Sequence, residues 1–105
     1  ERLLNVMKKN YMDSSFDGDR LADGVGMSRS LLVKKGKAET GQTVTQFIKD
    51  YRLNMAREML SQNEGNLNIT EIAYRVGFND PKYFTRCFSQ KYGTSPSNFV
   101  DSMTK

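Results

Sequence analysis

The sequence predicts an all-α fold of seven helices, and three observations support this prediction. Apolar residues recur every three or four positions along most of the chain, which is the spacing of one helix face. Most of these segments begin at a residue that can cap a helix, and several end at a Gly that can terminate one. No segment alternates apolar and polar residues as a half-buried strand does. With 105 residues, the chain forms one domain or two very small ones.

Three helices are predicted in residues 1–41. The first is indicated by four apolar residues at helical spacing, Leu3, Leu4, Met7 and Tyr11. After a polar break, Asp19 is expected to cap the second helix. Ser28 is expected to cap the third, which should run to about Thr40. Gly26 supplies the turn between these two helices, and Gly41 ends the third.

The longest regular pattern predicts a central helix. Thr43 and Gln46 have the spacing of a capping box at its start. The apolar stripe that follows consists of Val44, Phe47, Ile48, Tyr51, Met55 and Met59, with Leu60 beside it. The helix is expected to end near residues 63–65.

Three more helices are predicted in the last third of the chain. Asn68 and Glu71 have the spacing of a second capping box. Asp80-Pro81 places a capping residue before a Pro at the first helical position, and Ser95-Pro96 repeats this arrangement. The end of the chain is expected to fray from about Asp101.

The chain contains an internal repeat. Residues 21–27 (LADGVGM) reappear as residues 72–78 (IAYRVGF), and the match resumes after one inserted residue. The aligned pairs that follow are Ser28 with Asp80, Leu32 with Phe84, Lys34 with Arg86, Gly41 with Gly93, and Phe47 with Phe99. Each copy has a short apolar helix, a turn at Gly and a second helix with cations. This is the pattern of a helix-turn-helix, whose second helix can lie in the DNA major groove.

The central helix would separate the two copies by a fixed distance. A helix over residues 44–62 is about 28 Å long, and one turn of B-DNA is about 34 Å. Such a spacer can place two recognition helices in successive major grooves of double-stranded DNA. We therefore expect a single DNA-binding domain over residues 1–105. Its parts are a first helix-turn-helix unit at 1–41, a linker helix at 42–64 and a second unit at 65–105.

Composition favours binding over catalysis. The net charge of +4 and the isoelectric point near 9.3 favour a polyanionic partner without requiring one. With no His and one Cys, an internal disulfide is impossible and a metal site is not expected. No nucleophile–base set or phosphate-binding Gly loop indicates an enzyme, and no cofactor is expected. No apolar run approaches the ~20 residues of a membrane helix, and no signal peptide is visible, so we expect a cytoplasmic domain without membrane contact.

The outward residues of the second helix in each copy are candidate DNA contacts. In the first copy, with Leu32 inward, they are Arg29, Ser30, Val33, Lys34 and Lys37. In the second copy, with Tyr83 expected at the edge of the packed face, they are Asp80, Pro81, Lys82, Thr85, Arg86 and Ser89. Arg86 is the best candidate for base recognition, because Arg can bond guanine O6 and N7 bidentately. The candidate phosphate contacts are Asn68, Thr70, Lys82 and Lys91.

Two features of the first copy are unusual. Gly36 aligns with Phe88, an expected core position, and a Gly inside a helix costs about 1 kcal/mol relative to Ala. Leu31 and Val33 stand where polar base-reading residues would be expected. Three explanations remain open: looser packing of this copy, apolar contact with thymine methyl groups, or a different helix phase that buries Leu31 or Val33.

Residues 69–88 (ITEIAYRVGFNDPKYFTRCF) and 93–96 (GTSP) closely resemble the signature of the AraC/XylS family of bacterial transcription regulators. The upstream residues 26–30 (GMSRS), Gly41, 47–48 (FI), 52–53 (RL), Ala56 and Leu60 fit as well. The resemblance covers essentially the whole chain. It is most specific in the second copy.

This resemblance implies a seven-helix domain in which both recognition helices can enter adjacent major grooves and bend the DNA. Gly36 departs from the Phe or Leu of the family, and Val100 stands where many members have Arg. The family usually has a separate sensing or dimerisation domain, which is not found in these 105 residues. The sequences of both copies are also similar to those of output domains of two-component regulators, including hybrid histidine kinases.

One competing interpretation is a helical protein-interaction module that docks on RNA polymerase. Gly36, Leu31 and the modest net charge would favour it. Duplex binding measured against salt concentration distinguishes this module from a DNA-binding domain.

Overall fold

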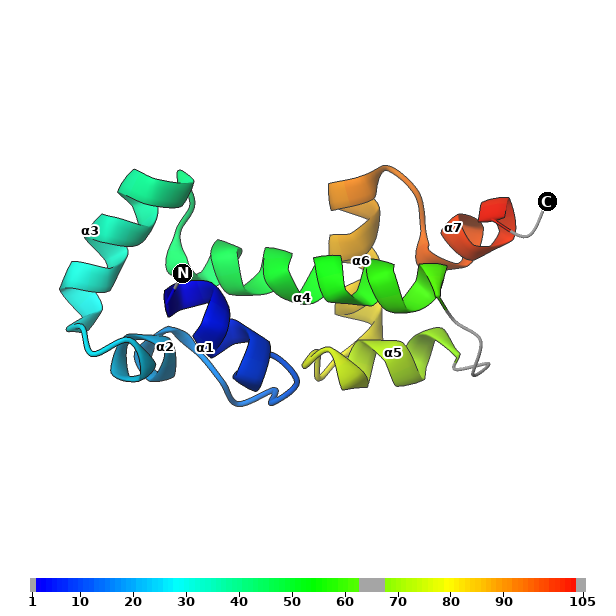
Figure 1. The fold of residues 1–105 in the computed structure, drawn as a ribbon. Coiled ribbons are helices and arrows are strands. Elements are labelled where there is room, and N and C mark those ends of the chain that lie inside the picture. Colours follow the sequence, from blue (N-terminus) through cyan, green and yellow to red (C-terminus); the bar gives the residue numbers. More distant parts are fainter. Residues whose placement is uncertain (1, 63–67, 104–105) are drawn as a thin grey trace.

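The computed structural model describes residues 2–62 and 68–103, which form seven helices and no strand (Figure 1). The helices are α1 (Arg2–Asn10), α2 (Gly18–Gly24), α3 (Arg29–Thr40), α4 (Val44–Ser61), α5 (Ile69–Arg75), α6 (Pro81–Tyr92) and α7 (Pro96–Met103). In Figure 1, α2 and α3 lie at one end of α4, and α5 and α6 lie towards the other. The predicted fold class is confirmed: all-α, with two helix-turn-helix units joined by a linker helix. Below, α1–α3 are called the first unit and α5–α7 the second unit.

The same turn closes the helix pair in both units. The Gly of each turn has a positive φ, 70° at Gly26 and 97° at Gly77. The residue after each Gly donates its N–H to a carbonyl five residues earlier, as in a Schellman motif. These bonds run from Met27 to Ala22 at 2.9 Å and from Phe78 to Ala73 at 3.0 Å. The internal repeat in the sequence is therefore a repeat in the structure.

Most predicted helix starts are confirmed. The side chains of Ser28, Thr43, Asn68 and Asp80 each accept a hydrogen bond from a backbone N–H two or three residues further on. The capping box of α5 is complete, because the side chain of its third residue also accepts the N–H of Asn68. Ser95 likewise accepts the backbone N–H three residues on, at 3.1 Å, and begins α7. These caps fix where the second helix of each unit begins.

The predicted cap of α2 is wrong by one half-turn. The cap is Asp17, whose carboxylate accepts the N–H of Arg20 at 3.1 Å. Asp19 lies in the first turn of the helix and instead binds the side chain of Arg29. The physical reason is that Gly18 already belongs to α2, so the residue before it takes the capping position.

Two predicted helix ends also differ. α4 ends at Ser61, with Gln62 as its C-cap, one or two residues before the predicted range 63–65. Residues 63–67 lie outside the described residues. α7 continues to Met103, beyond Asp101, where fraying was expected.

The linker helix α4 forms the common core of both units. It packs against α2, α3, α5, α6 and α7. Its buried residues are Val44, Ile48, Leu53, Ala56 and Leu60. The predicted stripe is partly wrong, since Phe47, Tyr51, Met55 and Met59 are only partly buried. Because the first unit covers the start of α4 and the second unit covers its later turns (Figure 1), the buried positions do not form one stripe.

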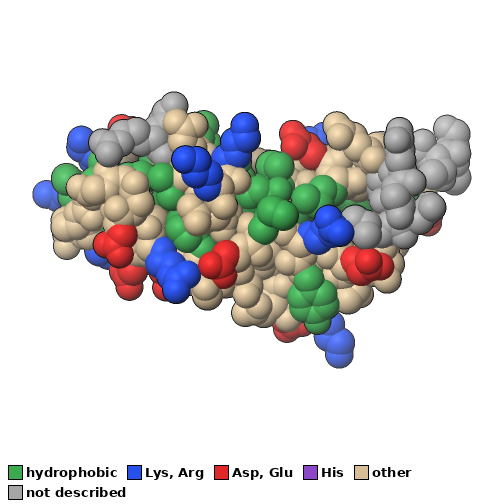
Figure 2. All heavy atoms as spheres, turned by 60° about the horizontal axis from the view of Figure 1, so that its bottom comes forward, with side chains coloured by type: hydrophobic (Ala, Val, Ile, Leu, Met, Phe, Trp, Pro, Cys, Tyr) green, Lys and Arg blue, Asp and Glu red, His purple; other side chains and the backbone are tan. Residues whose placement is uncertain are grey.

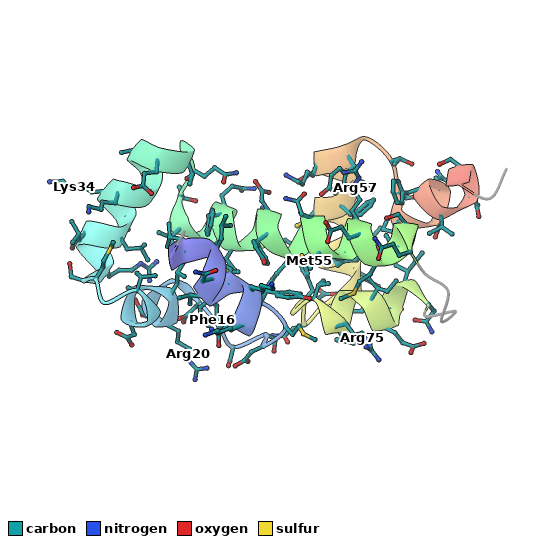
Figure 3. The ribbon with its side chains drawn as sticks, in the orientation of Figure 1. Phe16, Arg20, Lys34, Met55, Arg57 and Arg75 are labelled. Atoms are coloured by element: carbon teal, nitrogen blue, oxygen red, sulfur yellow. The ribbon has the colours of Figure 1, made fainter. Side chains whose placement is uncertain are left out.

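Aromatic rings fill the core of the second unit. Phe84 and Phe88 on α6 are completely buried, with ring centroids 5.9 Å apart. Phe88 also meets the rings of Tyr92 at 4.7 Å and Phe99 at 5.8 Å. Arg57 of α4 lies over the last two rings, 5.4 Å and 6.0 Å from their centroids (Figure 3). This chain of rings fixes α6 against α4 and α7.

The first unit has a hollow at the equivalent position. Gly36 is buried, yet a Cβ added to it would meet no atom within 4 Å. The space belongs to a small, partly open hollow of about 10 Å³ lined by Leu3, Leu21, Leu32 and Phe47, among others. No neighbouring side chain has moved in to replace the aromatic ring that occupies this position in the second unit. The explanation of looser packing in the first copy therefore has a structural basis.

Filling this hollow should stabilise the domain. Gly36→Ala removes the helix-propensity penalty of Gly without a clash, and we expect a gain of about 1 kcal/mol. For a domain of this size, thermal melting should then show a midpoint higher by roughly 4–8 °C. Gly36→Leu should gain more, because its side chain would also cover the apolar lining of the hollow. Gly41→Ala is the control: its φ of 73° is strained for Ala, so its midpoint should fall. An unchanged midpoint in both Gly36 variants would show that the hollow costs nothing.

Candidate nucleic-acid interface

The second helices of the two units, α3 and α6, are the candidate recognition helices. Both have twelve residues, both begin at a capped turn, and both end at a Gly with φ of 73°. α3 packs at the start of α4, and α6 crosses its later turns (Figure 1). The two helices are therefore presented by the same local structure at two points along one rigid helix.

The predicted contact residues of α3 all lie on its exposed side. Leu32 and Gly36 face the core, and the exposed candidates are Arg29, Ser30, Val33, Lys34 and Lys37. Lys34 extends from α3 at the end of the molecule (Figure 3). Leu31 and Val33 are 42% and 44% exposed, so the alternative helix phase that would bury them is wrong.

The predicted contact residues of α6 are also exposed. Phe84, Cys87 and Phe88 face the core, whereas Lys82, Tyr83 and Arg86 do not. Tyr83 is 45% exposed and its ring lies 6.0 Å from that of Phe78. A hydrogen bond with the Cys87 side chain is the main cause that raises the pKa of the Tyr83 phenol above its ordinary value of 10.0. Tyr83 therefore stays a neutral hydroxyl at pH 7, partly packed at the edge of α6 as predicted.

The candidate cations fall into two groups. Lys34, Lys37, Lys82 and Arg86 form no side-chain hydrogen bond or ion pair with another described residue, so their charges are available to a partner. Arg29 is paired with Asp19, with Nη1 2.7 Å from Oδ1.

Lys91 is also paired, 3.6 Å from Asp50, and only 28% of its side chain is exposed. Asp50 in turn accepts hydrogen bonds from the side-chain amides of Gln42 and Gln46. A phosphate contact by Lys91 would therefore compete with this carboxylate.

The two polar candidates at the start of α5 differ in whether their side chains are already hydrogen-bonded. The side-chain oxygen of Asn68 accepts the N–H of Glu71 at 2.8 Å, so this side chain serves first as a cap. Thr70 is exposed in the first turn of α5.

The face formed by the α1–α2 connection, α2 and α5 carries both positive and negative charges. Figure 2 shows cations and acids interspersed there, with apolar side chains across the middle. Within the described residues, no group of three or more Cys, Asp or Glu could hold a metal ion. Nor is any described helix long and apolar enough to cross a membrane.

The chain matches the model of a family described as a helix-turn-helix domain over residues 21–102. It is 35% identical to Histidine kinase P4 of Formosa agariphila, over 94% of this chain and 7% of that protein. It is 33% identical to the xylose operon regulatory protein of Escherichia coli K12, over 89% of this chain and 23% of that protein. The chain belongs to the AraC-type helix-turn-helix family.

A solved structure supports the same assignment at the level of the fold. The DNA-binding domain of AdpA, solved in complex with a target DNA, superposes with a TM-score of 0.83 at 24% identity. The match covers 97% of this chain and 92% of that one. The chain is thus an AraC-type DNA-binding domain of the kind found in transcription regulators, and it corresponds to a small part of each of the two relatives above.

One side chain of α4, that of Arg52, binds the first unit close to the turn of the second unit. The guanidinium of Arg52 donates from Nε to the carbonyl of Tyr11 at 3.0 Å. Its Nη2 donates to the carbonyls of Asp13 at 2.9 Å and Phe16 at 3.0 Å. Arg52 therefore binds three carbonyls of the connection between α1 and α2. Desolvation by burial lowers its pKa, an effect that nearby Asp13 partly opposes.

The turn of the second unit completes this joint. A Cβ on Gly77 would lie 2.3 Å from the carbonyl oxygen of Tyr11 and 2.7 Å from Nε of Arg52. The backbone of Gly77 can approach the first unit this closely because Gly has no side chain. A cleft of about 500 Å³ opens beside the joint, and its lining includes Phe16, Lys49 and Tyr83.

Sequence reasoning missed this joint and the pairing of Arg29 with Asp19. Arg52 and Tyr11 are 41 residues apart, and no local periodicity or motif relates such positions. One signal was present: the repeat places a Gly at both turns. The second of these, Gly77, lies against the other unit.

Adding one methyl group at Gly77 should damage the joint. Gly77→Ala combines the strain of a positive φ with a clash against the Tyr11 carbonyl. Gly93→Ala is the matched control, because Gly93 also has a positive φ but an added Cβ would meet nothing within 4 Å. In urea unfolding, Gly93→Ala should lose about 1–2 kcal/mol, and Gly77→Ala should lose at least about 2 kcal/mol more. Equal losses would show that the contact yields without cost.

Proposed function

We propose that this domain binds duplex DNA by placing α3 and α6 in two successive major grooves. The observation that supports this most directly is that the two equivalent helices, α3 and α6, both pack on the one helix α4. α4 has 18 residues and is about 27 Å long, and one turn of B-DNA is about 34 Å. The whole described molecule is 46 Å in its longest dimension, which is enough to span one helical turn.

The residue roles follow from exposure and charge. Arg86 is the proposed base reader of α6, because it is exposed and has no ion pair among the described residues. Lys34, its partner in the internal alignment, is proposed to have the equivalent position on α3, with Ser30, Val33 and Lys37 around it. Val33 is proposed to contact a thymine methyl group.

Further polar residues are proposed to hold the phosphates. These are Arg29, Asn68, Thr70, Lys82 and Lys91, whose contribution would not depend on base sequence. Tyr83 is proposed to support Arg86 from the edge of the groove.

The parent protein is proposed to be a bacterial transcription regulator that acts in the cytoplasm on DNA and RNA polymerase. The similarity to a histidine kinase over 7% of that protein supports the proposal that this domain is the output part of a two-component protein. The domain itself is proposed to have no enzymatic activity. A sensing or dimerisation domain would then supply the regulation.

An interaction module for RNA polymerase is the second candidate function. It is favoured by the two exposed apolar residues on α3, Leu31 and Val33. Selection of bound duplexes from a random library, followed by binding measured against salt concentration, separates the two functions. DNA reading requires a selected sequence and an affinity that falls steeply with salt, by about 0.9 log units per phosphate contact for each log unit of salt. No duplex binding at low salt would leave the interaction module.

Arg86→Ala should weaken binding to the selected duplex by about 1–3 kcal/mol and relax specificity at one base pair, because the bidentate contact is lost. Lys91→Ala should weaken all duplexes to a similar, smaller extent. The measurement is a titration of each variant against the selected duplex and against single-base variants of it. If Arg86→Ala weakens every sequence equally, Arg86 contacts phosphate and not a base.

A further inference from the structure

The first residue of α3 is bound to the first turn of α2. Nη1 of Arg29 lies 2.7 Å from Oδ1 of Asp19, although 46% of the Arg29 side chain and 72% of the Asp19 side chain are exposed. An exposed ion pair of this kind adds little to stability. Its close geometry therefore calls for another explanation.

Gly18 provides the space that this geometry needs. A Cβ on Gly18 would lie 2.7 Å from Cζ of Arg29 and 2.9 Å from each of its Nη atoms. The guanidinium thus lies directly on the backbone of the first turn of α2, at a place that a larger residue would fill. Gly18 is buried beneath it.

The second unit has no such arrangement. Superposing the two N-caps, Asp17 and Asn68, aligns Gly18 and Asp19 with Ile69 and Thr70. Arg29 aligns with Pro81, the first residue of α6. The acid, the Gly and the Arg are therefore all specific to the first unit, where they occur together.

Two carboxylates at the start of α2, those of Asp17 and Asp19, would repel DNA phosphates from the first unit. Arg29 offsets that charge and has donors to spare. A guanidinium has five N–H donors, and Asp19 accepts one of them in the only side-chain bond that Arg29 makes to described residues. The remaining donors are held in a fixed orientation beside the proposed contact face of α3.

We propose that Asp19 and Gly18 are positioning residues that hold Arg29 as a preoriented phosphate clamp of the first unit. This inference rests on the proposed function, since it assigns one of its phosphate contacts. Asp19 orients the guanidinium plane, and Gly18 lets it lie flat. The free N–H groups bind a non-bridging oxygen of the DNA backbone.

The test compares four variants of the 105-residue chain on the selected duplex and on an unrelated duplex. Arg29→Ala should weaken both about tenfold and reduce the salt slope by about one contact. Asp19→Asn should weaken both about threefold. This direction is decisive, because removing an acid would tighten DNA binding if charge alone mattered. Gly18→Ala should act in the same direction by displacing the guanidinium.

Arg20→Ala is the matched control. Like Arg29, Arg20 is an exposed arginine that pairs with an aspartate, in its case Asp13 at 3.3 Å, but it lies on α2. It points away from α3 towards the α1–α2 connection (Figure 3), and its loss should change affinity less than twofold. Circular dichroism and melting confirm that each variant folds, and Asp19→Asn alone suffices if Gly18→Ala does not.

Unchanged or tighter binding by Asp19→Asn overturns the clamp, because Asp19 would then be a bystander or a competitor for Arg29. If that result is obtained and Arg86→Ala still relaxes base specificity on the same duplexes, the clamp fails but the proposed function stands. If the unmodified domain binds no duplex at low salt, the proposed function and the clamp fail together.

Discussion

The arrangement of the molecule depends on one partly buried contact, in which the guanidinium of Arg52 binds three carbonyls of the α1–α2 connection. The helices of each unit pack on α4 and on one another, and not mainly on the helices of the other unit. Arg52 adds a directional constraint to this packing. An Arg suits this role because its planar fork holds several acceptors in fixed directions, which the single ammonium of a Lys cannot do. Gly77 adds a steric constraint, since its backbone rests on one of the same carbonyls.

A rigid joint matters because two linked binding elements gain affinity only if both can engage at once. If the units were free to rotate, ordering them on DNA would cost conformational entropy at every binding event. The joint removes that cost in advance. The joint lies at the middle of α4, at Arg52, between the parts of α4 that carry the two units.

The limits of the sequence prediction follow from the range of the interactions. Helix number, most caps and the outward residues of α3 and α6 were predicted correctly, because capping bonds and helical periodicity act over two to four residues. The cap of α2 was wrong because Asp17 and Asp19 are equally good capping residues, and only the position of Gly18 decides between them. The buried face of α4 was partly wrong because two units cover it from different sides. The contact of Arg52 with Tyr11 spans 41 residues, beyond the reach of any local pattern.

The two units hold their second helices, α3 and α6, in place by different interactions. The second places a buried aromatic chain behind α6 and leaves Arg86 unpaired on its surface. The first has a hollow at Gly36, and one of its proposed contact residues, Arg29, is bound to α2 through Asp19. A well-packed helix can hold a base-reading side chain in register through its core alone. A less well-packed helix needs a direct bond near its start, and the pair of Arg29 and Asp19 supplies one at the first residue of α3, two turns from the hollow. The looser packing at Gly36 and the ion pair of Arg29 with Asp19 therefore occur together in the first unit, and the ion pair compensates for the packing.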